Sequence, residues 1–135
     1  MKEGNFPAAD FSGKRFLVAE DMEVNREIAA EYLRKTGAAV EFAEEGRRCV
    51  EMISLAPAGY YDLVLMDINM PVMNGLEATK RLRQMGFTLP VIAMTANVGD
   101  RDRRAALDAG MDAFVEKPVR VEKLFSEMAK CLGGR

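Results

Sequence analysis

Four apolar runs of strand length in this chain each end in side chains that could do chemistry. If these runs form parallel strands, their carboxyl ends meet at one edge of a sheet, where α/β proteins place their ligands. Three carboxylates, one hydroxyl and one ammonium group would then converge. The residues are Glu20 and Asp21 after the first of these runs, Asp67 after the second, Thr95 after the third and Lys117 after the fourth.

Such a set of groups suits phosphoryl chemistry assisted by a divalent cation. Carboxylates are the hard oxygen ligands that Mg²⁺ prefers, and bound Mg²⁺ commonly keeps water and a phosphoryl oxygen in its shell. An aspartate such as Asp67 can act as the nucleophile toward a phosphoryl group, as in known aspartyl-phosphate intermediates. Thr95 and Lys117 would then bind the transferred oxygens. The sequence therefore predicts an acidic magnesium site with an aspartate nucleophile.

Apolar runs alternate with helix-like segments along the chain, which predicts five strands and five helices. The runs are short and apolar enough to be buried on both faces, as in parallel sheets. Because strand–helix–strand crossovers are right-handed, the alternation predicts a doubly wound α/β fold. The predicted strands cover residues 16–19, 39–43, 63–66, 91–94 and 113–115, and the predicted helices cover residues 23–36, 44–55, 76–84, 102–109 and 121–132.

The first predicted helix carries its apolar side chains at the spacing of an amphipathic helix. Val24, Ile28 and Tyr32 recur every four residues, Leu33 widens the stripe, and Gly37 follows as a C-cap. This spacing predicts a helix over residues 23–36.

Composition indicates one cytoplasmic domain. With 135 residues, of which 49% are hydrophobic, a single domain with a full core is the default. The 19 basic and 21 acidic residues are interspersed, so we expect no direct nucleic-acid or membrane contact. No run is long enough to span a bilayer, and residues 1–12 lack the apolar core of a secretion signal. Residues 1–13 read as a linker or expression remnant, and residues 14–133 as the domain.

Cysteine and histidine usage narrows the chemistry further. Cys49 and Cys131 lie in predicted helices without metal-ligand spacing, so we expect two unpaired structural thiols. The chain contains no histidine, which rules out a phosphohistidine carried by this polypeptide. A phosphohistidine donor would have to be another chain or a domain outside this sequence.

Five short motifs, in this order, resemble the receiver domain of two-component signalling over residues 14–132. Each motif is weak alone, but each falls at a predicted strand end or in the loop after it, and together they are specific. The motifs are Leu17-Val18-Ala19-Glu20-Asp21, Leu65-Met66-Asp67-Ile68-Asn69-Met70-Pro71, Asn74-Gly75, Met94-Thr95-Ala96 and Glu116-Lys117-Pro118.

The resemblance implies a flavodoxin-like sheet with strand order 2-1-3-4-5 and a phosphoacceptor role for Asp67. The donor would be a phosphohistidine. Asp21 and Asp67, with the backbone carbonyl of Asn69, would coordinate Mg²⁺ or Mn²⁺, and Glu20 would contact the metal mainly through water. Transfer of the signal would follow from a change of conformation after phosphorylation.

The resemblance also assigns roles around the phosphorylated group. Thr95 and Phe114 would form the switch, Thr95 moving toward the phosphoryl oxygen while the aromatic ring turns inward. Lys117 would pair with the phosphate, and its bond to Pro118 is expected to be cis. A final pair, Asn69 and Asn97, would tune the lifetime of the phosphoryl group.

Details of the motifs look most like receivers fused to hybrid sensor histidine kinases, and a stand-alone receiver or an excised response-regulator domain stays open. The donor would be a kinase core or a histidine phosphotransfer domain that docks near the first helix, at Asn25, Ala29 and Tyr32. The output face, and the surface of a weak homodimer, would be residues 102–109, 113–115 and 121–132. Apart from its own phosphorylation and dephosphorylation, no enzymatic activity is assigned to the domain.

Two other functions compete with this interpretation. An aspartate-nucleophile phosphatase of the haloacid-dehalogenase type also uses a strand-end Asp, a Thr, a Lys and Mg²⁺. That class needs a second Asp two positions after the nucleophile, where this chain has Asn69. A non-phosphorylated interaction domain is the other alternative, and it is disfavoured because every pocket residue is present.

Overall fold

The computed structural model describes residues 9–133 and contains one parallel sheet with strand order β2-β1-β3-β4-β5. The predicted doubly wound α/β fold and its strand order are confirmed. Most of the predicted linker, residues 1–8, lies outside the described part of the chain. In chain order the elements are β1 Arg15–Ala19, α1 Glu23–Arg34, β2 Ala39–Ala43, α2 Gly46–Leu55, β3 Leu63–Asp67, α3 Gly75–Gln84, β4 Val91–Thr95, α4 Asp100–Ala109, β5 Ala113–Glu116 and α5 Val121–Gly133.

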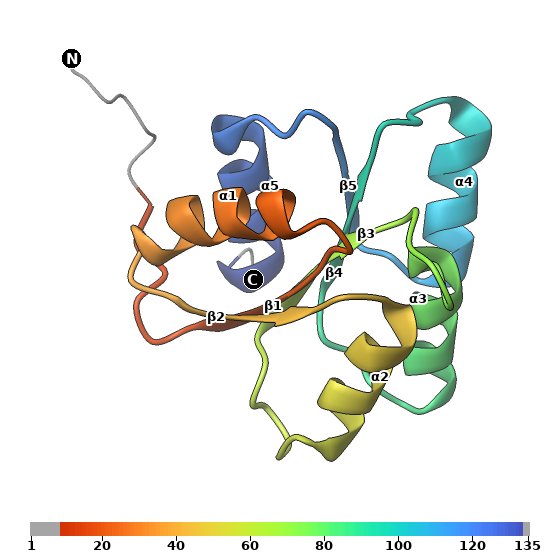
Figure 1. Cartoon of the computed structure of the whole chain (residues 1–135), viewed down its shortest axis with the longest axis horizontal. Coiled ribbons are helices and arrows are strands. Elements are labelled where there is room, and N and C mark those ends of the chain that lie inside the picture. Colours follow the sequence, from red (N-terminus) through yellow and green to blue (C-terminus); the bar gives the residue numbers. More distant parts are fainter. Residues whose placement is uncertain (1–8, 134–135) are drawn as a thin grey trace.

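Helices cover both faces of the sheet (Figure 1). Every residue of β3 and β4 is buried, as expected for strands packed on both sides. Alternate residues of each strand enter two separate cores: Leu17 and Met66 pack with α2 and α3, whereas Val18 and Leu65 pack with α1 and α5. This double burial fixes the strands, and therefore the positions of the residues at their ends.

Three of the predicted strands extend by one residue to include the polar residue that follows the apolar run. Asp67 lies opposite Met94 in the ladder, and Thr95 lies opposite Glu116. The backbone N–H of Ile68 still donates to the carbonyl of Met94 beyond the paired residues. Asp67 and Thr95 are therefore the last residues of rigid strands, which holds their side chains at defined positions.

Helix α1 is two residues shorter than predicted and buries only part of its apolar stripe. It ends at Arg34, and its buried residues are Ala30 and Leu33. Of the apolar stripe, Leu33 is buried and Tyr32 packs against the core, whereas Val24 and Ile28 are 57% and 49% exposed. The four-residue spacing identified the helix, and the carboxyl-terminal part of the stripe contacts the core. Val24 and Ile28, at the amino-terminal end of the stripe, lie on the surface.

Side-chain caps mark the starts of α2 and α3. The side chain of Glu45 accepts a hydrogen bond from the backbone of Arg47, so α2 begins at Gly46, two residues after the predicted start. Asn74 and Glu77 form a capping box at the start of α3. Helix α4 begins at Asp100, two residues earlier than predicted.

Part of the predicted linker packs on the domain. Phe11 is 9% exposed, and its ring makes edge-on contacts with the rings of Phe16 and Phe125. Its backbone N–H donates to the carbonyl of Thr36. One aromatic residue without periodic neighbours gave no sequence signal for this contact.

The thiols behave as expected from the sequence. Cys49 and Cys131 are both free, and burial raises the pKa of Cys49 to about 12. None of the helices within residues 9–133 has the length and apolar character that crossing a bilayer requires.

The loop between β3 and α3 holds a strained residue, and its replacement provides a test. Val72 has a φ of 67°, although it is β-branched and 69% exposed. Left-handed backbone costs such a residue about 1–2 kcal/mol, and asparagine tolerates it better. We expect Val72→Asn to raise the free energy of unfolding by roughly 1 kcal/mol in urea titrations. Val24→Asn, at an exposed helical valine, should give no such gain; equal shifts for both variants would contradict the strain.

Candidate acidic active site

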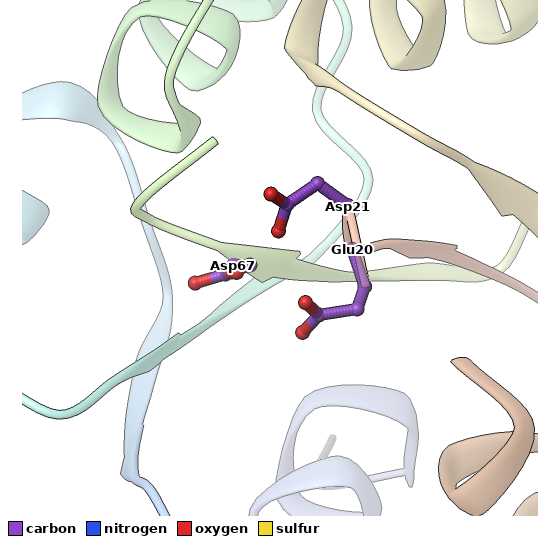
Figure 2. A group of neighbouring side chains, drawn as sticks. All are labelled: Glu20, Asp21 and Asp67. Atoms are coloured by element: carbon purple, nitrogen blue, oxygen red, sulfur yellow. The ribbon is translucent and has the colours of Figure 1, made fainter. Parts of the chain in front are cut away.

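Three carboxylates meet at the carboxyl ends of β1 and β3. Glu20 and Asp21 directly follow β1, and Asp67 ends β3. One oxygen from each carboxylate lies within 4.8 Å of the others, and Figure 2 shows the three side chains at the ends of the two strands with their carboxylates turned to the same side. Glu20 and Asp67 are buried, at 2% and 3% exposed, whereas Asp21 is exposed.

Lys117 bridges two of these carboxylates. Its Nζ lies 3.1 Å from Oδ2 of Asp67 and 3.2 Å from Oε1 of Glu20. Burial by itself lowers the pKa of Lys117, but attraction to Asp67 and Glu20 outweighs burial, so the pKa lies above its ordinary value. The ammonium group is therefore held charged between the carboxylates. The Lys117–Pro118 peptide bond is cis, as expected.

Asp67 has one partner on each carboxylate oxygen. Oδ2 pairs with Lys117, and Oδ1 accepts a hydrogen bond of 3.2 Å from the backbone N–H of Asn69. Burial raises the pKa of Asp67, and the negative charge of Glu20 raises it further. Lys117 and the Asn69 N–H oppose that rise but do not cancel it. The folded protein thus holds a carboxylate whose charge is poorly compensated.

Glu20 is held by contacts that the sequence analysis did not predict. Its Oε2 accepts hydrogen bonds from the backbone N–H of Met22 at 3.2 Å and from Nδ2 of Asn25 at 3.4 Å. Arg26 donates to the backbone carbonyl of Glu20 at 2.8 Å. Polar residues in the first turn of α1 were the available signal. These contacts fix Glu20 without using its Oε1, which pairs with Lys117.

Two glycines let the loop after β3 lie close to the site. The N–H of Gly75 donates to the carbonyl of Ile68, and a Cβ at position 75 would collide with the carbonyl of Asp67. The N–H of Gly46 donates to Met73, and a Cβ at position 46 would collide with the carbonyl it contacts. The loop that carries Asn69 is thereby anchored to the starts of α2 and α3.

The structure also places the remaining predicted residues. Thr95 is 1% exposed and ends β4, one position past the residue opposite Asp67. Its Oγ1 accepts a hydrogen bond of 3.0 Å from the backbone of Asn97, whose side chain is exposed. Phe114 is half-buried on β5, opposite Ala93. The metal-binding role of the Asn69 carbonyl and the lifetime roles of Asn69 and Asn97 stay predictions.

The donor set fits a small, hard dication. Three carboxylate oxygens converge, no sulfur or imidazole lies among them, and one lysine offsets only part of their charge. Glu20, Asp21 and Asp67 are the side chains that could hold such an ion.

The chain belongs to the response regulator receiver domain family, whose model matches residues 16–129. It is a receiver domain of two-component phosphorelay signalling, and receiver domains bind Mg²⁺ in their acidic site. The comparisons favour neither a phosphatase nor a non-phosphorylated interaction domain.

Curated relatives include both stand-alone and kinase-fused receivers. The chain is 44% identical over 118 residues to the two-component response regulator ORR41 of Oryza sativa subsp. japonica, covering 86% of this chain and 92% of that protein. It is 36% identical over 114 residues to the sensor histidine kinase RcsC of Escherichia coli strain K12, covering 84% of this chain but only 12% of that protein.

Solved receiver structures share the fold. The receiver domain of the sensor histidine kinase PA1611 from Pseudomonas aeruginosa, with magnesium coordinated in its active-site cleft, matches with a TM-score of 0.81 and 31% identity over 90% of this chain and 99% of that one. The Saccharomyces cerevisiae co-crystal structure of the histidine phosphotransfer protein Ypd1 with the receiver domain of Ssk1 matches with a TM-score of 0.79 and 26% identity over 95% of this chain and 91% of that one.

Proposed function

We propose that Asp67 accepts a phosphoryl group from a phosphohistidine on a partner protein, in a reaction that requires Mg²⁺ at Glu20, Asp21 and Asp67. The observation that carries the proposal is the cluster of three carboxylates around one lysine at the ends of adjacent strands. A carboxylate oxygen of Asp67 attacks phosphorus, the N–P bond breaks, and its electron pair returns to the imidazole, which takes up a proton. The product is an aspartyl phosphate, and its hydrolysis by water restores the carboxylate.

The protein's own groups prepare Asp67 for this reaction. Lys117 and the N–H of Asn69 favour its ionised form, which is the nucleophile. After transfer, the Lys117 ammonium lies close enough to pair with the phosphoryl oxygens, and the hydroxyl of Thr95 can donate to another. Bound Mg²⁺ would supply positive charge that offsets the crowded carboxylates and the transferred phosphoryl group.

The added charge would then drive a switch. A phosphoryl group brings roughly 1.5 to 2 negative charges to a buried site. Thr95 would move toward it, and Phe114 would turn inward from its half-buried position. Partners that distinguish the two conformers then read the phosphorylation state.

Intact-protein mass spectrometry after incubation with acetyl phosphate tests the proposal. With Mg²⁺ present, we expect one phosphoryl adduct, which alkaline hydroxylamine should remove because acyl phosphates react with it. Chelation of Mg²⁺ should prevent adduct formation. If neither acetyl phosphate nor phosphorylated histidine phosphotransfer proteins produce an adduct, the proposal fails; repeated turnover of phosphomonoesters would instead favour a phosphatase.

A groove beside the site is the proposed docking place of the donor. It has a volume of about 500 Å³, and Glu20 and Lys117 are among its lining residues, so it reaches the acidic cluster. Ile28, an exposed apolar residue of α1, lines it, and large exposed apolar surfaces commonly mark interaction sites. The groove is also lined by Asn25, Ala29 and Tyr32 of α1 and by Pro118 and Val119 of the loop before α5.

A charged residue at position 28 should block the donor protein but not the small donor. Docking would bury the Ile28 side chain, worth about 1–2 kcal/mol, and a buried unpaired carboxylate would cost more. We therefore expect Ile28→Glu to slow phosphotransfer from phosphorylated Ypd1 by at least about tenfold. Leu55→Glu is the matched control, since Leu55 is 81% exposed and does not line the groove. If both variants slow transfer equally, or if the acetyl phosphate reaction slows too, the docking proposal is contradicted.

We also propose that the natural setting is a hybrid sensor histidine kinase. The motif details and the sensor-kinase relatives, among them RcsC and PA1611, support this, while ORR41 supports a stand-alone receiver. Weak self-association through α4, β5 and α5 stays a prediction.

A further inference from the structure

We propose that Arg103 is a positioning residue that holds the Phe114 ring in the unphosphorylated arrangement. This inference rests on the proposed function and adds a regulatory residue on α4 to it. Arg103 lies in the first turns of α4, and its guanidinium carbon is 5.1 Å from the centroid of the Phe114 ring. That distance is within the range of a cation–π interaction.

The surroundings of Arg103 make the ring its main partner. Arg103 is exposed, and within residues 9–133 no carboxylate forms an ion pair with it, although Asp100 and Asp102 are near in sequence. Phe114 is half-buried on β5, which is an edge strand of the sheet. A guanidinium group over a half-exposed ring covers it from the solvent side. Inward rotation of the ring would remove it from this contact.

The same chain segment links Arg103 to the phosphorylation site. Thr95 ends β4, and α4 begins at Asp100 after a short connection. The cap residue of α4 is Gly99, so no side chain caps this helix. Thr95 also accepts a backbone hydrogen bond of 2.8 Å from Lys117 through its carbonyl oxygen. A shift of Thr95 toward a phosphoryl group would act on the start of α4. A movement of Thr95 would therefore reach Arg103 through α4 and change its contact with Phe114.

The expected consequence is a shift in population. A contact made only in the unphosphorylated conformer lowers the fraction of molecules in the other conformer, and a ligand of that other conformer then binds more weakly. Loss of a cation–π contact at an exposed position should change that equilibrium by about two- to fivefold. Arg103→Ala should therefore bind a phosphoryl analogue about two- to fivefold more tightly than the wild type does.

Binding of beryllofluoride at saturating Mg²⁺ tests the proposal. Arg103→Ala should lower the apparent Kd by that factor, Arg103→Lys should restore part of the difference, and Arg104→Ala should match the wild type. Arg104 is the adjacent exposed arginine, and it lies over no aromatic ring of residues 9–133. A Phe114→Leu background should remove the effect of Arg103→Ala, as expected for two residues that act through one contact.

The outcomes separate the inference from the proposed function. If the wild type binds no beryllofluoride and takes up no phosphoryl group, the proposed function fails, and the role of Arg103 fails with it. If the wild type binds but Arg103→Ala and Arg104→Ala are equal, only the role of Arg103 is overturned. An effect of Arg103→Ala that persists in the Phe114→Leu background also overturns it. Thermal unfolding of each variant shows that the proteins compared are folded.

Discussion

Asp67→Asn is expected to abolish the Mg²⁺-dependent phosphoryl adduct and, without metal, to make the protein harder to unfold. The first effect follows because the amide is not a nucleophile toward phosphorus. The second follows from repulsion, since the carboxylate of Asp67 lies close to those of Glu20 and Asp21, and Lys117 is the one cation of residues 9–133 that pairs with this cluster. Two carboxylates within 4.8 Å repel by about 3 kcal/mol at an effective dielectric constant of 20.

Lys117 offsets part of this repulsion, so the gain in unfolding free energy should be roughly 1–2 kcal/mol. Its pH dependence has a definite sign. The pKa of Asp67 is raised in the folded protein above its ordinary value of 3.8, so the folded state keeps this proton to higher pH than the unfolded chain does. The destabilisation of the folded protein by ionised Asp67 is therefore absent below pH 3.8 and grows as pH rises through the raised pKa.

Urea unfolding in the presence of a chelator measures this effect. The difference between Asp67→Asn and the wild type should be larger at neutral than at acid pH. Saturating Mg²⁺ should stabilise the wild type more than the variant, because the variant has lost one ligand. The control is Asp108→Asn, at an exposed carboxylate of α4 outside the cluster. An adduct on Asp67→Asn, or a variant that is less stable than the wild type without metal, would contradict the arrangement.

The strand ends were predictable from the sequence because their signal is local. A parallel strand buried on both faces must be apolar, and its first polar residue marks the carboxyl end where ligands bind. The predictions for Asp67 and Thr95 needed only this rule and the order of the motifs. Their strands run one residue further than predicted, because ladder hydrogen bonds extend past the apolar run.

Contacts across the chain were not predictable in the same way. Lys117 pairs with Glu20 across 97 residues, a contact that depends on how the loop after β5 folds back over the end of β1. Sequence analysis assigned Lys117 to the phosphate and did not foresee its carboxylate partner. The stripe of Val24 and Ile28 shows the same limit. Helical spacing shows which side chains share a face, but it does not show that Ala30 and Leu33 are buried while Val24 and Ile28 are exposed.

Lys117→Met is expected to have the opposite effect on stability to Asp67→Asn, and to slow phosphorylation. Of the residues in the range 9–133, Lys117 is the one cation that pairs with Asp67. Removal of the ammonium group leaves the buried carboxylates of Glu20 and Asp67, and the exposed one of Asp21, without this positive charge. The loss in unfolding free energy should be roughly 2 kcal/mol without metal, below the 3–5 kcal/mol of a fully buried pair because the lysine side chain is 27% exposed.

The contribution of Lys117 also has a characteristic pH range. Its pKa is raised in the folded protein, so its stabilising effect is fully present below the ordinary value of 10.5 and is lost as pH rises through the raised pKa. At neutral pH the full difference between the wild type and Lys117→Met should therefore appear. Lys123→Met, at an exposed lysine of α5 that pairs with Glu127, should change stability by less than about 1 kcal/mol.

Mg²⁺ distinguishes the loss of charge compensation in Lys117→Met from a general loss of packing. In the wild type Mg²⁺ must compete with the Lys117 ammonium group for the carboxylates of Glu20 and Asp67. In the variant these two carboxylates have no ammonium partner, so Mg²⁺ binds them without competition. Mg²⁺ should therefore bind Lys117→Met more tightly and raise its unfolding midpoint by more than that of the wild type. The adduct from acetyl phosphate should nevertheless form at least about 100-fold more slowly, because the charge that stabilises the transferred oxygens is gone. A variant with ordinary Mg²⁺ affinity and an unchanged rate would show that Lys117 only fills space at the strand ends.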